Sequence, residues 1–526
     1  MNLNLPIANH NLAITRFFFV IAIVISFFCQ IYIDSSNLNI IYNVTALVIS
    51  IISITYLFQK NIILKHPISS LSILGYVLYY FILPPLATNS EGKSIINNLI
   101  LPLQTLIHTS LLLCFLITSH IIYIETNQYF KLSNIWKRYF IFCNIFSNIS
   151  GLKLTFFVFL VLLSQLSTIF FKTGNEDNEF LKLLQGINYF IFLPFILLNP
   201  GLFNLKENKN HYLLLFYYFI TILLVGVLLN GRSFVFLGIA SIFISYLFNF
   251  GYGFVKLSLS KTFFLRFFVC VLCVFFLINP ITKLSIAFVM ARNVRNDISP
   301  IELINETVFQ YRAIENPKEI LESLKELQES SLSLWDEHYV DNPFLARLCN
   351  LKFADNSLVI INELSIDEKA KFRQIELHKI ISLLPYPIIK VLNISVDKNE
   401  VTSGSSGDFL FYIQTGDINS IGTFRTGSLI GSSFAIFGWY YLIILSFVFF
   451  LIFPAIDSLA ITNIHQNGTI HFSPIAFVSF FPLLFCFTSA ATGSESISSL
   501  LGIFRMLIEK PILFYIILKL ISLAKK

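Results

Sequence analysis

The chain has 526 residues, of which 56% are hydrophobic and only 13% are charged, and its mean hydropathy is +0.75. In ordinary soluble domains the apolar stretches are shorter and are interrupted by charges. This composition therefore excludes a soluble globular protein and indicates a polytopic membrane protein. The formal net charge is +6, but the basic residues occur in short pieces between apolar stretches. We therefore expect the lipid bilayer, and no nucleic acid, as a partner.

Apolar stretches of about 20 residues, long enough to cross a bilayer as a helix, recur along the chain. They predict an all-α polytopic fold with about twelve transmembrane helices, near 13–33, 38–58, 68–87, 100–124, 154–171, 181–200, 212–229, 234–250, 263–290, 428–453, 472–492 and 500–523. Basic connecting segments alternate with segments that hold little positive charge. By the positive-inside rule, both termini are predicted to be cytoplasmic.

The last apolar stretch, 500–523, is the least regular of the set. Arg505, Glu509 and Lys510 interrupt it, and Pro511 leaves only a short clean apolar run. Because proline removes a backbone donor and clashes with the preceding turn, we expect a broken or re-entrant helix here.

Residues 291–427 form a long polar segment between the ninth and tenth predicted spans, here called the cap. The cap contains 14 Lys or Arg and 20 Asp or Glu, a net charge of −6, whereas the rest of the chain carries +12. The alternation of basic connections places the cap on the outer side of the membrane. The chain thus divides into nine spans (1–290), a large extracytoplasmic cap (291–427) and three further spans (428–526).

Two helix-start signals predict that the cap is mainly helical. One helix is expected to begin at 316–319, where Asn, Pro, Lys and Glu follow each other. Ser365 and Glu368 form a capping box for another, which carries Leu377, Ile381 and Leu384 before Pro385. These apolar stripes could pack on each other or lie on the membrane surface, and mutual packing is the more economical assumption. The small residues of 402–408 should resist regular structure, as an exposed loop or a flap over a site.

Arginines at the predicted outer membrane edge are the first candidates for a functional site. Arg232 lies in a short turn between two spans, and Arg425 lies between two glycines just before the tenth span. A guanidinium can hold two oxygens of a diphosphate, so both are predicted to bind one anion; alternatively, Arg232 caps a helix or reaches to the interface. Arg292, Arg295 and Arg312 extend a basic rim or form a solvated helix face.

A group transfer at this edge would also need a base. His378, in the helix that Ser365 opens, and His338 are the two histidine candidates, because imidazole accepts a proton near neutral pH. Asp408, with Asp417, is the carboxylate alternative. His and Cys pairs at metal-binding spacing are lacking outside the spans, so no metal or other cofactor is expected.

These features together resemble the Wzy-type polymerases of O-antigen and related oligosaccharide repeat units. The resemblance rests on Gly231-Arg232-Ser233 in a short outer turn, on one large outer loop before the last spans, and on the stretch from Gly427 to Phe437-Gly438. It implies a bacterial inner membrane protein, and a metal-independent glycosyltransferase that joins undecaprenyl-diphosphate-linked oligosaccharides. It also implies flippase and chain-length regulator proteins as partners.

Other classes remain open at this stage. An O-antigen ligase would use the same outer cleft with a different acceptor, and sequence does not separate it from a polymerase. A metal-dependent glycosyltransferase would be expected to show paired acidic residues in its first outer loop, where only Asp34 occurs. A transporter would more naturally carry ionisable residues inside its spans and internal repeats.

Overall fold

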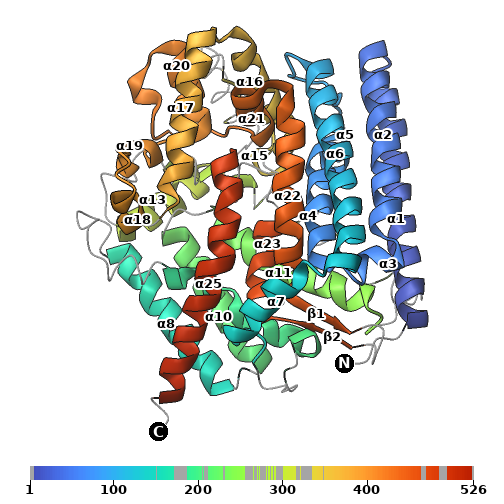
Figure 1. The fold of residues 1–526 in the computed structure, drawn as a ribbon. Coiled ribbons are helices and arrows are strands. Elements are labelled where there is room, and N and C mark those ends of the chain that lie inside the picture. The colour runs from blue at the N-terminus through green and yellow to red at the C-terminus, as the bar shows by residue number, and fades with distance from the viewer. Residues whose placement is uncertain are drawn as a thin grey trace.

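The computed structural model describes residues 5–147, 149, 151–170, 186–203, 205, 211–228, 232–254, 300–314, 320, 335–346, 349–384, 386–423, 425–463, 469–484 and 495–523, with isolated positions between 265 and 291. Most of the described chain is helical, and its helices form a bundle with the cap helices at one end (Figure 1). Both termini lie at the opposite end of the bundle. The core is continuous from the first helices to the last.

Within the described residues, five helical stretches are long and apolar enough to cross a membrane. They are α1 (Leu5–Ile33), α2 (Asn37–Leu57), α4 with the π-helical η1 and α5 (Pro67–Val77, Leu78–Ile82, Leu83–Ser90), α6 (Pro102–Phe130), and α21 with η7 and α22 (Leu429–Phe437, Gly438–Tyr440, Tyr441–Asp457). A short helix, α3 (Lys60–Ile63), joins α2 to α4.

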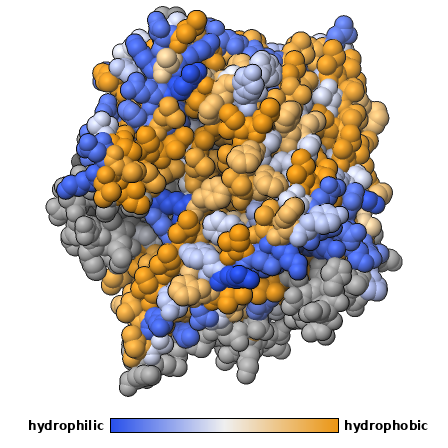
Figure 2. Space-filling view, viewed as in Figure 1, coloured by the Kyte–Doolittle hydropathy of each residue, from blue (hydrophilic) through white to orange (hydrophobic). Residues whose placement is uncertain are grey.

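Large apolar side chains cover the outside of these stretches. Phe28 is 64% exposed on α1, Ile52 59% on α2 and Phe447 60% on α22. Figure 2 shows this apolar surface over α6 and α22, with hydrophilic residues gathered over the cap helices and around α7 (Ser133–Phe142). Such a surface requires an apolar surrounding. The protein is therefore a helical membrane protein.

The middle of the chain contains shorter elements. They are α8 (Gly151–Phe170), η2 (Asn188–Phe190), η3 (Leu193–Leu198), η4 (Pro200–Phe203), α10 (His211–Leu228) and α11 (Arg232–Gly251). The spanning helix predicted over 181–200 is wrong for its described part, which forms three 3₁₀ turns instead. Pro194 and Pro200 lack the backbone N–H that a continuous helix needs. The span predicted over 263–290 lies mostly outside the described residues.

The C-terminal part contains a short hairpin and corrects one expectation. The antiparallel hairpin of β1 (Ala460–Asn463) and β2 (Thr469–Phe472) precedes α23 (Pro474–Leu484) and is the small amount of sheet in a described fold that is otherwise consistent with the predicted all-α class. The final stretch is one continuous helix, α25 (Ile497–Leu523), and the prediction of a broken helix is wrong. Arg505 Nε and Glu509 Oε1 pair at 2.7 Å one turn apart, which supports the helix in the turn before Pro511.

The cap is built from short helices around a small core of its own. They are α13 (Pro300–Ala313), α15 (Pro343–Ala346), α16 (Leu351–Glu363), α17 (Ile366–Ser382), α18 (Tyr386–Val391), α19 (Lys398–Thr402), α20 (Ser406–Thr415) and the 3₁₀ turn η6 (Ile418–Ser420). The helix start predicted at 316–319 lies outside the described residues. The capping box of Ser365 and Glu368 at the start of α17 is confirmed.

Two expectations about the cap are wrong. The stripe on α17 does not pack inward, because Leu377 is 46% and Leu384 36% exposed, whereas Phe372 and Glu376 are buried. Segment 402–408 is irregular only at 403–405, so the second expectation is wrong for its other four residues. Ser405 and Asp408 form a second capping box there, which starts α20.

Helix α16 attaches the cap to the bundle through the start of α6. Its Asp355 is fully buried and accepts hydrogen bonds from the backbone N–H groups of Ile100 (2.8 Å) and Leu101 (2.7 Å). The first N–H groups of a helix have no partner within it, so a carboxylate from another element stabilises this start. Lys352, one turn away, donates to the Asn98 carbonyl at 2.5 Å. The cap is thereby fixed to the membrane helices.

Candidate functional site

A buried carboxylate shapes the loop that joins the cap to α21. Asp408, on the first turn of α20, accepts hydrogen bonds from the backbone N–H groups of Ser405 (3.1 Å), Gly422 (3.1 Å) and Arg425 (2.8 Å) and from the Thr423 hydroxyl (2.9 Å). Asp408 as a whole is 0% exposed. This arrangement favours a role in holding the loop over the predicted role as a base, because these donors already occupy both oxygens.

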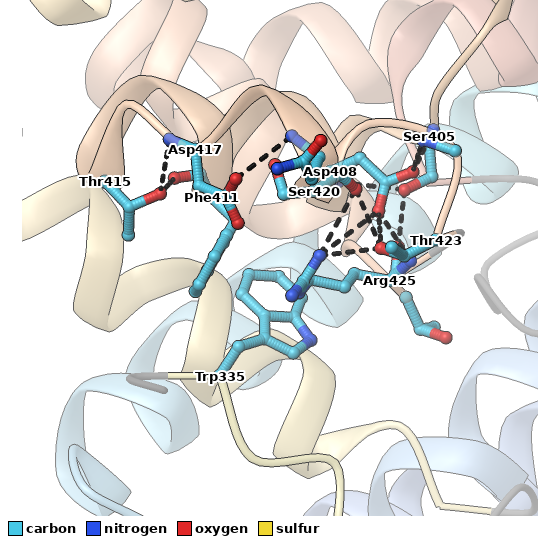
Figure 3. A network of polar contacts seen from close by, with 12 residues as sticks. Trp335, Ser405, Asp408, Phe411, Thr415, Asp417, Ser420, Thr423 and Arg425 are labelled. Atoms are coloured by element: carbon cyan, nitrogen blue, oxygen red, sulfur yellow. Dashed lines mark hydrogen bonds and ion pairs between the residues drawn. The ribbon is translucent and has the colours of Figure 1, made fainter. Parts of the chain in front are cut away.

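The loop holds the Arg425 side chain in one place. Its Nη1 donates to the Ser420 carbonyl (3.2 Å) and to the Thr423 hydroxyl (2.6 Å), and its guanidinium carbon lies 4.1 Å from the centre of the Phe411 ring. Figure 3 shows these contacts, with Trp335 beside the arginine. The side chain is 23% exposed. A guanidinium fixed on an aromatic ring at the junction of cap and bundle is pre-organised to bind an anion.

Residues 335–338 run beside this loop and present alternate sides. Glu337 Oε1 accepts hydrogen bonds from the backbone N–H of Thr426 (2.8 Å) and from the Trp335 indole (3.3 Å). Asp336 instead contacts Asn98, on the connection between α5 and α6. Trp335 and Glu337 therefore face the Arg425 loop, whereas Asp336 faces the bundle.

His338 lies on the side of Asp336. Its Nδ1 is 2.9 Å from Asp336 Oδ1, and its backbone carbonyl accepts a hydrogen bond from Asn98. Burial alone would raise the pKa of Asp336, but the hydrogen bonds from His338 and Asn98 outweigh it and lower that pKa well below its usual range. A carboxylate held in this way fixes the orientation of the imidazole. It also directs His338 toward the α5–α6 connection rather than toward Arg425.

A second carboxylate, Glu495, lies where the start of α20 meets the start of α25. Its Oε2 accepts a hydrogen bond from the backbone N–H of Ser406 (3.1 Å). The backbone of Gly407 passes so close that a Cβ there would lie 2.8 Å from Gly427 N, and a Cβ on Gly427 would lie 3.3 Å from Glu495 Oε2. Only glycine fits at these two positions. The segment 402–408 and the glycine-flanked loop of Arg425 therefore pack closely against each other beside Glu495.

Two side chains of α17 complete this group. Glu376 is 0% exposed, and its Oε1 accepts a hydrogen bond from the Ser406 hydroxyl at 2.6 Å. Lys379 Nζ lies 3.6 Å from Glu376 Oε1 and donates to the Gly404 carbonyl at 3.2 Å. Sequence reasoning missed Glu495 and Glu376. The sequence did contain one signal for Glu495, which is the only Asp or Glu between Asp457 and Glu509.

The remaining predicted site residues are not brought to this junction by any contact of the described residues. His378 lies two residues after the buried Glu376, so its side chain leaves α17 on a different face. Arg312 is exposed on the last turn of α13. Arg232 is the first residue of α11, but its side chain lies outside the described part, as do Arg292 and Arg295. The shared diphosphate site of Arg232 and Arg425 stays a prediction.

Among the described residues, no three His, Cys, Asp or Glu side chains are grouped so that they could hold a metal ion. The described junction brings together a fixed guanidinium, a lysine and three carboxylates at the start of α20, which are those of Glu376, Asp408 and Glu495. Fold and site together define a helical membrane protein with a polar site between its cap and its membrane helices. Comparison of the chain with protein-family models, with curated proteins and with solved structures found no match.

Proposed function

We propose that the protein is a polymerase that joins undecaprenyl-diphosphate-linked oligosaccharide repeat units by glycosyl transfer at the outer face of the bacterial inner membrane. The observation that carries the proposal is the position of Arg425. Its guanidinium is held by Phe411, Ser420 and Thr423 where the cap meets the membrane helices. The diphosphate of a lipid-linked sugar lies at the depth of the lipid headgroups, so an anion site at this junction suits that substrate.

In this reaction a hydroxyl of the acceptor sugar attacks the anomeric carbon of the donor sugar. The bond between that carbon and the diphosphate oxygen breaks, and the diphosphate leaves with the electron pair. Arg425, together with Arg232 as predicted from the sequence, would neutralise the charge that develops on the leaving group. The acceptor proton must pass to a base. Fixed guanidinium groups supply the positive charge in this scheme, so no metal is invoked.

Replacement of Arg232 tests the proposal in the native host. We expect Arg232→Ala to abolish long surface glycan and Arg232→Lys to restore little of it, because an ammonium does not reproduce the two-oxygen grip of a guanidinium. Surface glycan length is read on a gel, with protein level followed in the same membranes. Long-chain glycan at normal length and normal protein level in Arg232→Ala would remove the phosphate role of this residue.

The sidedness of the cap has its own test. A reporter enzyme that is active only outside the cytoplasm is inserted at Asn393, an exposed residue in the turn between α18 and α19. We expect activity there, and none from the same reporter fused after Lys526. The reverse pattern would place the cap in the cytoplasm and would exclude a polymerase that acts at the outer face.

A transporter is the second candidate, and one observation favours it. The described spans do contain ionisable residues: Asp457, at the end of α22, lies 3.1 Å from His66 Nδ1, and His120 on α6 contacts Ser69 at 2.9 Å. Buried ionisable groups in spans often mark an ion or substrate path. A structural role would also explain the buried Asp457, because this carboxylate accepts a hydrogen bond from the backbone N–H of Ser69 (2.9 Å) at the start of α4.

A further inference from the structure

The group around Ser406 is unusual because two carboxylates from different elements meet one serine. Its backbone N–H binds Glu495, which precedes α25, and its side-chain hydroxyl binds Glu376 of α17. The N-terminus of a helix favours negative charge, so one of these carboxylates has a structural explanation. The second adds a charge that this helix start does not need.

Glu376 has one oxygen that the described residues leave without a donor. Its side chain is fully buried and points at the start of α20, yet its Oε2 has no hydrogen-bond partner among the described residues. Leaving a buried carboxylate oxygen unpaired costs free energy, and such positions call for an explanation. Because Glu376 is fully buried, the side of this group that a ligand could reach is formed by Glu495 and Lys379.

Glu495 is the more accessible of the two carboxylates. The residue is partly exposed, whereas Glu376 is 0% exposed. Glu495 also touches the loop that carries Arg425, since Gly427 packs against its carboxylate. It therefore lies at the same junction as the predicted diphosphate site.

We propose that Glu495 is the catalytic base that takes the proton of the acceptor hydroxyl, and that Lys379, which the buried Glu376 holds in place, orients the acceptor sugar beside it. This inference rests on the proposed function. As the acceptor oxygen forms its bond to the anomeric carbon, its proton moves to Glu495, and the bond to the diphosphate breaks. The products are the extended glycan, undecaprenyl diphosphate and a protonated Glu495, which releases its proton to water.

The surroundings of Glu495 suit this role. Burial raises the pKa of Glu495 to about 7, against the opposing effects of Lys379 and of the backbone N–H groups of Gly427, Gly407 and Ser406. The charged groups on the packed elements are Glu376 and Lys379 on α17, Asp408 on α20 and Arg425 on the loop. A base with a pKa near the working pH transfers protons most effectively.

The experiment uses the full-length protein in proteoliposomes with lipid-linked oligosaccharide extracted from the membranes of the host. We expect Glu495→Gln to lower the turnover rate about 10²- to 10⁴-fold with little change in the KM for the donor. The wild-type rate should fall as the pH drops below about 7, and this fall should be lost from the residual rate of Glu495→Gln. Glu495→Asp, which keeps a carboxylate, should retain part of the wild-type rate, and its rate should still fall as the pH drops.

Glu509→Gln serves as the matched control, because it makes the same change at an exposed position of the neighbouring α25. A Glu495→Gln rate within about threefold of wild type, well below the effect expected for a lost base, would overturn the inference. So would an unchanged pH profile in that variant. Equal thermal unfolding of the Gln and Asp variants separates a chemical effect from misfolding. If the wild-type protein itself forms no polymer and releases no undecaprenyl diphosphate, the proposed function fails, which is a distinguishable result.

Discussion

Replacing Arg425 by Ala is expected to reduce polymer formation by about 10²- to 10³-fold, the usual effect of removing one fixed donor to a developing negative charge. The structure gives the reason: the guanidinium is already immobilised on Phe411 and by the Ser420 carbonyl, so binding the diphosphate requires little further ordering of the side chain. The measurement is the rate of undecaprenyl diphosphate release in proteoliposomes that contain the donor from the host.

Arg425→Lys should recover only a small part of this rate, since an ammonium neither stacks on Phe411 in the same way nor holds two oxygens at once. Arg373→Ala, at an exposed position of α17, makes the same change away from the junction and should leave the rate unchanged. Thermal unfolding is measured in parallel, because Arg425 also ties its own loop together. A stable Arg425→Ala protein with a wild-type rate would contradict the anion site.

The sequence predicted those features that depend on local chemistry. The capping box of Ser365 requires only residues three positions apart, and the structure contains it. The position of Arg425 followed from its place between a polar segment and an apolar one. Where the prediction needed knowledge of the partner surface it was wrong, as for the stripe of Leu377 and Leu384, which α17 leaves exposed while it buries Glu376.

The missed residues share one physical cause. Asp355, Asp457 and Glu495 each accept backbone N–H groups at the start of a helix that is distant in the chain. A sequence pattern reveals a cap only when the capping residue is a neighbour, as Ser405 is for α20. When the carboxylate comes from another element, only the folded chain brings donor and acceptor together. For the same reason the sequence suggested His338 as a base and did not suggest Glu495.

Asp457 provides the largest expected effect on stability. It is buried, and its oxygens accept hydrogen bonds from the backbone N–H groups of Ile68 (3.1 Å) and Ser69 (2.9 Å) and from the hydroxyls of Ser69 (2.7 Å) and Tyr123 (3.0 Å). His66, the residue before α4, makes no side-chain cap of its own to that helix. The carboxylate of α22 therefore supplies the cap that α4 lacks and joins it to α6.

We expect Asp457→Ala to lower the free energy of unfolding by about 3–5 kcal/mol, because it leaves these buried donors and His66 without their acceptor. Asp457→Asn, which keeps one acceptor oxygen, should cost less. Thermal unfolding of the purified protein in detergent measures both, with Asp367→Ala on the exposed first turn of α17 as the matched control. If Asp457→Asn instead unfolds like wild type while activity is lost, the carboxylate serves a path through the spans, and the transporter becomes the better proposal.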